Sequence, residues 1–290
     1  MITLFATPKD FTGIFKTIQI NALRSWRQLS PEIQIIILGN SEGSGRIAAE
    51  LEAEYVPDVR CSKEGTPILS DLFKQAEKRA KFPLMTFINA DIILPENFLE
   101  GVFITTQRFK KFLMVGHRWD LDVQHEIDFN NQIEKSIFWE MAAGKCQKHP
   151  CTGIDYFVFN KGLWKSLPDF IIGRPGYDNW LIWNIRRRML PVIDASEYIN
   201  VIHQIHDYNF HNVTNSKDVR TGNEAKTNIK LHKEKLLNIL DANYKIINSE
   251  IIKKTAPDEI SRFWHRLPSV FPEFTLPIKL IRRLKFRLDR

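Results

Sequence analysis

The chain has 290 residues with an ordinary composition, 43% hydrophobic and 26% charged, which suits one large globular domain or one domain with an extension. No stretch approaches the roughly 20 apolar residues that a membrane span needs, and the first residues do not have the pattern of a signal peptide. The net charge is +7, but residues 279–290 alone contribute +5, so the charge does not indicate a nucleic-acid-binding core. Three cysteines without zinc-site spacing predict a reducing, cytoplasmic location.

The first 95 residues alternate between strand and helix patterns. Strand patterns cover residues 2–8, 33–40, 55–60 and 83–94, and helix patterns cover residues 12–29, 45–55 and 66–80. Thr66 is expected to cap the third helix, with Pro67 in its first turn. This order predicts an α/β fold with a mostly parallel central sheet flanked by helices.

Ligands bind at the carboxyl ends of the strands in such sheets. Three strand ends carry polar or turn residues: Thr7 with Pro8, Gly39 with Asn40, and the triplet Asn89 to Asp91. We therefore expect these three segments to border one crevice.

The second half of the chain is more irregular. Residues 112–123, 153–164, 190–196 and 198–208 are strand-like, residues 176–188 begin a helix, and the chain from about residue 216 is polar and helical. We expect a catalytic domain over residues 1–215, with a nucleotide-binding half (1–95) and an acceptor half (96–215). A helical, basic extension is expected over residues 216–290.

Two pairs of residues have the spacing of a site for a metal-bound diphosphate. Asn89 and Asp91 are two residues apart on an extended segment, so both can face one divalent ion. Asp120 and Asp122 have the same spacing and form a rival site; if the first pair holds the ion, one of them would contact the sugar or acceptor. The alternatives are a simple turn or a helix cap at the first pair and a solvated loop at the second.

Two further groups can carry chemistry. Asp178 follows a glycine-rich loop at the start of a predicted helix, where it can act as a general base or simply cap the helix. Trp180 beside it suits a sugar-stacking wall or the core. His203 and His206, near Asp207 and His211, are potential metal or phosphate ligands, with a polar surface turn as the alternative.

The order of these parts resembles the GT-A nucleotide-sugar glycosyltransferases of the family 2-like kind. The segments "GYDNWL", "HQIHDYNFH" and "RTGNEAKTNIKL" are similar to an uncharacterised bacterial and plant group of such proteins, and the resemblance covers about residues 1–245. It implies a GT-A fold and transfer of a sugar from a nucleoside diphosphate sugar to a hydroxyl group of a glycan or lipid-linked acceptor. Metal assistance, by Mn²⁺ or Mg²⁺, and inversion are also implied.

The resemblance also implies roles for individual residues. Thr7 and Pro8 would lie by the nucleotide base, and Asn40 by the base or ribose. Asp91 matches the metal-binding Asp of the Asp-x-Asp motif, and His206 a late histidine near the metal or diphosphate. Asp178 matches the catalytic Asp of inverting members. Asn89 departs from the pattern, since an Asp is usual at its position.

Two other classes of function remain open. A sugar-nucleotide-binding protein without transferase activity is compatible with Asn89, and a nucleotidyltransferase would need a Gly- and Arg-rich loop that the segment after the first strand lacks. In the tail, residues 276–290 form a basic amphipathic pattern that predicts docking on an anionic membrane surface, at the inner membrane face, or packing on the domain or a partner.

Overall fold

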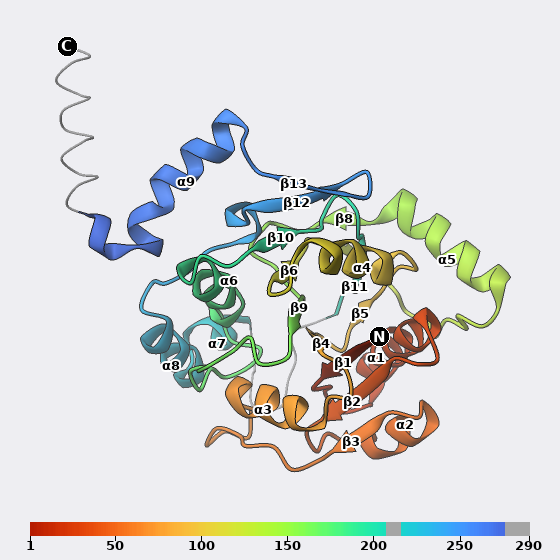
Figure 1. The fold of residues 1–290 in the computed structure, drawn as a ribbon. Coiled ribbons are helices and arrows are strands. Elements are labelled where there is room, and N and C mark those ends of the chain that lie inside the picture. Colours follow the sequence, from red (N-terminus) through yellow and green to blue (C-terminus); the bar gives the residue numbers. More distant parts are fainter. Residues whose placement is uncertain (207–215, 276–290) are drawn as a thin grey trace.

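A computed structural model describes residues 1–206 and 216–275. Its centre is a nine-stranded sheet in the order β13-β12-β10-β6-β9-β4-β1-β2-β3 (Figure 1). These strands are β1 (Ile2–Ala6), β2 (Gln34–Leu38), β3 (Glu54–Val56), β4 (Leu84–Ile88), β6 (Leu113–Val115), β9 (Tyr156–Asn160), β10 (Val192–Asp194), β12 (Tyr244–Ile247) and β13 (Glu250–Lys253).

The helices surround this sheet. They are α1 (Gly13–Leu29), α2 (Ser44–Glu50), α3 (Leu69–Arg79), α4 (Phe98–Arg108), α5 (Gln132–Lys145), α6 (Tyr177–Arg187), α7 (Ser216–Thr221), α8 (Asn223–His232) and α9 (Pro257–Val270), with short 3₁₀ turns η1 (Ile239–Asp241) and η2 (Pro272–Phe274). No helix within residues 1–206 and 216–275 is long and apolar enough to cross a membrane.

The sheet is mostly parallel, as the sequence predicts. β1 pairs in parallel with β2 and β4, and β10 pairs in parallel with β6 and β12. β9 is antiparallel to both of its neighbours, and β13 is antiparallel to β12. All the other strands therefore point the same way, and their carboxyl ends lie along one edge.

Both faces of the sheet are buried, which explains the continuous apolar runs of its strands. Successive side chains of a strand point to opposite faces. Leu4 accordingly packs in the cluster that contains α1, α2 and α4, and Phe5 packs in the cluster with α3 and α6. Helices therefore pack on both faces of the sheet.

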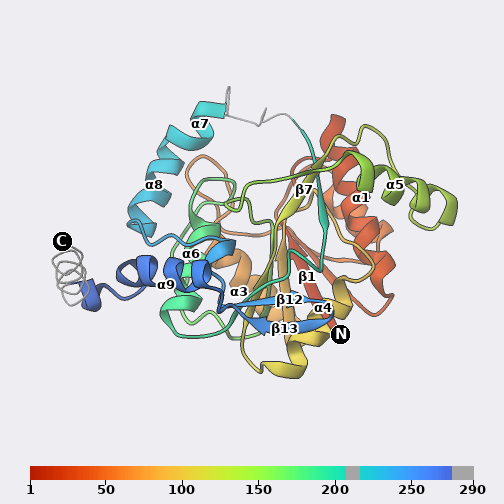
Figure 2. The same cartoon turned by 90° about the horizontal axis from the view of Figure 1, so that it is seen from above.

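A second, four-stranded sheet stands beside the carboxyl edge of the first. Its order is β5-β11-β7-β8, formed by β5 (Ile92–Ile93), β11 (Val201–Gln204), β7 (Arg118–Leu121) and β8 (Gln147–Lys148). Phe129, and Phe138 of α5, pack against this second sheet in a separate hydrophobic core. Figure 2 shows α1 and α5 on one side of the molecule, with α7 and α8 on the other.

Two expectations about the elements need correction. The third helix begins at Leu69, not at Pro67, because Pro67 and Ile68 form bridges with Cys61 and Ile171. The chain beyond residue 216 is not wholly helical, because β12 joins the main sheet beside β10 and turns into β13. The turn between them, Asn248-Ser249, has both residues at positive φ, as a tight hairpin requires.

Candidate functional site

The segment Asn89 to Asp91 leaves β4 at the carboxyl edge of the sheet and enters β5. Gln204, at the end of β11, fixes this turn by donating from its side-chain amide to the carbonyl of Asp91 at 3.0 Å. β5 and β11 are antiparallel partners, with Ile92 opposite His203. The register therefore brings His203 beside Asp91, although 112 positions separate them in the sequence.

A carboxylate and two imidazoles meet at this turn. Nε2 of His206 lies 3.1 Å from Oδ2 of Asp91, and Nε2 of His203 lies 3.7 Å from the same oxygen. One potential ligand atom of each residue lies within 4.8 Å of the others. The other carboxylate oxygen of Asp91, Oδ1, is buried and has no hydrogen-bond partner among the described residues. This set of donors fits a divalent cation.

Burial opposes the ionisation of Asp91. The charge of His203 and the hydrogen bond from His206 outweigh burial, together with the nearby charge of Lys9, and hold the pKa of Asp91 well below its usual range. Asp91 is consequently a carboxylate at neutral pH, which is the form that binds metal.

Asp120 stands behind the histidines. β7 runs parallel to β11 with Asp120 opposite His203, and Oδ1 of Asp120 lies 2.9 Å from Nδ1 of His203. Its other oxygen, Oδ2, lies 2.6 Å from Nδ1 of His149, and Nε of Arg118 forms an ion pair with Oδ1 at 3.1 Å. Burial disfavours the charge of Asp120, but these partners hold its pKa below the usual range.

Asn89 faces another carboxylate instead of the histidines. Its side-chain amide donates to Oδ1 of Asp155 at 2.5 Å, and its backbone N–H donates to the carbonyl of Asp155 at 2.9 Å. Oδ2 of Asp155 accepts a hydrogen bond from Arg118 at 2.9 Å. The two polar residues of the triplet therefore point to different partners, unlike the arrangement expected from their spacing.

Positive charge lies close to Asp91. Nζ of Lys9, just beyond β1, stands 4.2 Å from the centre of the Phe15 ring, which packs 5.1 Å from the His206 ring. Burial lowers the pKa of Lys9 to about 7; the charge of Asp91 works against this shift, and that of Arg174 adds to it. Arg174 is itself fixed by Glu224 at 2.6 Å.

Asp178 lies in the first turn of α6. Burial raises the pKa of Asp178 to about 7. The backbone N–H of Asn179 opposes this shift, and the negative charge of Asp155 adds to it. Asp155 thus links the Asp178 end of the site electrostatically to Asn89. A carboxyl group with a pKa near neutrality is suited to accept a proton at physiological pH.

The other predicted residues are arranged as follows. At the ends of β1 and β2, Thr7 is half-buried, the carbonyl of Pro8 accepts from Ser41 at 2.8 Å, and Asn40 accepts from Tyr55 at 3.1 Å. These segments lie together at the carboxyl edge, as expected for neighbouring parallel strands.

Two predicted residues lie elsewhere. Asp122 is exposed and accepts a hydrogen bond from Gln124, because β7 ends at Leu121 and the alternation of the strand stops there. Trp180 is only 6% exposed and packs between Phe170 and Trp183, an environment that favours the core alternative over a sugar-stacking wall. Asp207 and His211 lie outside the described residues, as do residues 276–290.

Sequence reasoning missed five polar residues of the site: Lys9, Arg118, His149, Asp155 and Arg174. Lys9 had a signal, because it directly follows Thr7 and Pro8 at a strand end. No sequence signal pointed to Asp155, because it directly precedes β9. Its position at the carboxyl edge follows from the antiparallel direction of β9, which brings the start of this strand to that edge.

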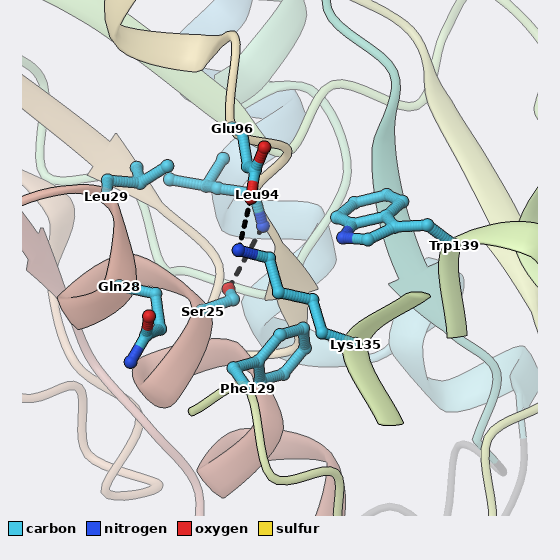
Figure 3. A pocket seen from close by; sticks show the side chains of 8 residues that line it. All are labelled: Ser25, Gln28, Leu29, Leu94, Glu96, Phe129, Lys135 and Trp139. Carbon is cyan, nitrogen blue, oxygen red and sulfur yellow. Dashed lines mark hydrogen bonds and ion pairs between the residues drawn. The ribbon is translucent and has the colours of Figure 1, made fainter. Parts of the chain in front are cut away.

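A separate hollow lies between α1, α5 and the segment after β5 (Figure 3). Its volume is about 190 Å³, below the 300–1,000 Å³ that is common for ligand pockets. Lys135 reaches across it to Glu96, and the hydroxyl of Ser25 accepts a hydrogen bond from the backbone of Leu94 (Figure 3). It shares no lining residue with the cluster at Asp91.

Comparisons with known proteins concern the fold. No family model and no curated protein matches the sequence. Similar solved structures include a mycobacterial protein (15% identity, TM-score 0.49, 80% of this chain and 74% of that chain). They also include glucosyl-3-phosphoglycerate synthase from Mycobacterium tuberculosis with Mn²⁺, UDP and glucosyl-3-phosphoglycerate (14%, 0.46, 80% and 79%). A third is TarS from S. aureus (10%, 0.46, 70% and 36%).

Each TM-score is below 0.5, so the chemistry assigned to the site depends on the side chains of this chain.

Proposed function

We propose that the chain is a glycosyltransferase that moves a sugar from a nucleoside diphosphate sugar to a hydroxyl acceptor with inversion. The observation that carries the proposal is the carboxylate–imidazole cluster of Asp91, His203 and His206 at the carboxyl edge, together with Asp178, whose pKa of about 7 suits a base. The reaction needs positive charge that stabilises the departing diphosphate and a base that takes the proton of the acceptor hydroxyl.

The donor would lie along the carboxyl ends of β1, β2 and β4. Thr7, Pro8 and Asn40 would contact the nucleoside. Asp91 and His206 would hold a divalent cation, which when bound supplies positive charge to stabilise the departing diphosphate. Lys9, which is partly protonated at neutral pH, adds positive charge near Asp91, and Arg174 adds positive charge near Lys9; both would attract an anionic group.

Asp178 would take the proton of the acceptor hydroxyl. Its pKa near 7 leaves a substantial fraction ionised at neutral pH. In this proposal residues 96–215 form the acceptor half, with Asp120 behind the histidines instead of in contact with the sugar. Single displacement by the activated hydroxyl gives inversion.

The proposal is tested by transfer and hydrolysis assays with a panel of UDP, GDP, dTDP and CDP sugars. Asp91→Ala and Asp178→Asn should each lose activity, and Asp128→Asn, an exposed site in a turn, should retain it. Wild-type activity in both Asp91→Ala and Asp178→Asn would contradict the proposed glycosyltransferase function. A thermal-shift screen of the same nucleotides with and without Mn²⁺ identifies the donor.

A second candidate is a sugar-nucleotide-binding protein without turnover. The orientation of Asn89 favours it, because this residue supplies no second carboxylate to the cluster. Calorimetry would distinguish the two: nucleotide-sugar binding with no release of nucleoside diphosphate, on any acceptor pool, supports the binding protein.

We also propose that residues 276–290 bring the protein to the cytoplasmic face of an anionic membrane, where a lipid-linked acceptor is available. Six basic residues lie between Lys279 and Arg290. The preceding helix α9 exposes Ile260, Phe263 and Trp264, residue types that insert at lipid interfaces.

A further inference from the structure

We propose that His203, held by Asp120, is a third protein ligand of the cation at Asp91, and that the site therefore selects transition-metal ions such as Co²⁺ and Mn²⁺ over Mg²⁺. The role of the cation in transfer rests on the proposed function. The binding of the cation does not, because it can be measured without nucleotide.

The distances fit shared coordination. Metal–ligand bonds to imidazole nitrogen and carboxylate oxygen of about 2.0–2.2 Å bring neighbouring ligand atoms to roughly 3–3.6 Å of one another. Oδ2 of Asp91 lies 3.1 Å from Nε2 of His206 and 3.7 Å from Nε2 of His203. Both nitrogens are thus close to the separation that coordination of one ion requires.

The orientation of His203 is fixed from behind. Nδ1 of His203 faces Oδ1 of Asp120 at 2.9 Å, and a carboxylate accepts at this position, so Nδ1 carries the proton. When the ring is neutral, the form that binds metal, its lone pair is then on Nε2, the atom that faces Asp91. A carboxylate behind a metal-binding histidine is a recurrent arrangement that fixes the tautomer and raises the basicity of the ring.

The contacts of Asn89 and Asp91 explain why the cation would need His203 as a further ligand. Asn89 is committed to Asp155 by both its side chain and its backbone, so Asp91 is the one polar residue of the triplet that faces the cluster. Oδ1 of Asp91 is buried and lacks a hydrogen-bond partner among residues 1–206 and 216–275, a cost that a bound cation would remove.

The donor set determines the choice of metal. Mg²⁺ prefers oxygen ligands in octahedral geometry, whereas imidazole suits transition metals, and affinity rises from Mn²⁺ to Co²⁺ in the Irving–Williams order. Two nitrogens and one carboxylate should therefore bind Co²⁺ most tightly, Mn²⁺ next and Mg²⁺ least.

The test uses the full chain after treatment with a chelator and titrates each metal alone by calorimetry. We expect affinity in the order Co²⁺, Mn²⁺, Mg²⁺. His203→Ala should weaken Mn²⁺ binding at least tenfold, and Asp120→Asn by about 10–100-fold. Asp128→Asn makes the same chemical change in an exposed turn and should leave the affinity unchanged. Thermal unfolding without metal checks that each variant is folded.

Pulsed electron paramagnetic resonance of bound Mn²⁺ gives a second readout that needs no variant, since each coordinated imidazole nitrogen couples to the ion. Two couplings are expected in the wild type and one in His203→Ala. One coupling in the wild type, unchanged Mn²⁺ affinity in His203→Ala, or equal affinity for Mg²⁺ and Mn²⁺ would overturn the proposal. Selective metal binding without transferase activity would instead contradict only the proposed function.

Discussion

The side-chain amide of Asn89 donates a hydrogen bond to the carboxylate of Asp155 over 2.5 Å, in a position where the two residues also share a backbone hydrogen bond. Asp155 is 5% exposed, so a second carboxylate in place of the amide would face it with little water between. Asn89→Asp should therefore lower the free energy of unfolding by about 2 kcal/mol at pH 7, because it replaces a buried hydrogen bond with a repulsion.

The same variant distinguishes two interpretations of the triplet. If Asn89 faced the cation, Asn89→Asp would tighten Mn²⁺ binding; with Asn89 bound to Asp155, no gain is expected. Urea unfolding and Mn²⁺ calorimetry measure the two effects. Asn200→Asp is the control, since Asn200 is exposed and its side-chain oxygen, which accepts from Trp119, is kept.

Asp178→Asn should reduce the turnover rate by about 10²- to 10⁴-fold, the usual contribution of a general base. The base acts in its ionised form and its pKa is about 7, so wild-type turnover should rise with pH through 7 and level off above it. The variant's residual activity should lack this rise. A wild-type profile that is flat between pH 5.5 and 8.5 would contradict the assignment of Asp178.

The same carboxyl group should make stability depend on pH. The pKa of Asp178 is raised from 3.8 to about 7 by burial, so its contribution to stability is complete below pH 3.8 and is lost as pH rises through 7. Asp178→Asn, which cannot ionise, should therefore melt at a higher temperature than the wild type at pH 8, with the difference shrinking toward pH 5. Asp58→Asn, at an exposed position, should show no such trend.

Glu224 should stabilise the loop that leads to Asp178. Its carboxylate is 3% exposed and pairs with Arg174 at 2.6 Å and with the Thr66 hydroxyl at 3.0 Å. Glu224→Ala leaves a nearly buried guanidinium without its carboxylate, so we expect a loss of about 3 kcal/mol in unfolding free energy. The half-exposed pair of Glu273 with Arg187 is the matched control, and Glu273→Ala should lower the free energy of unfolding far less than Glu224→Ala, because solvent screens an exposed pair.

The sequence predicts the first half of the fold well because its elements follow local rules. β2 is a run of apolar residues buried on both faces, and the stripe Leu69, Leu72, Phe73 and Ala76 of α3 is buried as its spacing indicates. β12 and β13 were not expected, although their alternating residues and the Asn248-Ser249 turn have the pattern of a hairpin. The sequence around these two strands is polar and rich in lysine, like that of the helices before them, and this similarity led to the prediction of a wholly helical segment.

The site was predictable only in part, because its geometry depends on strand direction and register. Asp91, His206 and Asp178 could be chosen from their positions at the ends of elements. The partners Asp155 of Asn89 and Asp120 of His203 come from other strands, and one residue of slip would separate them. From its spacing alone, Asp120 was predicted to form an alternative metal site to that of Asp91. The parallel pairing of β7 and β11 instead places Asp120 behind His203.

Removal of residues 278–290 should abolish binding to vesicles that contain phosphatidylglycerol. Each Lys or Arg near an anionic surface contributes about 1 kcal/mol, and the segment carries six of them with one acidic residue. Co-sedimentation at 0.1 M and 0.5 M salt measures the effect, since salt weakens an electrostatic contact, and neutral phosphatidylcholine vesicles are the control. If the segment instead packs against the domain, its removal should lower the melting temperature and leave vesicle binding unchanged, which would contradict the membrane proposal.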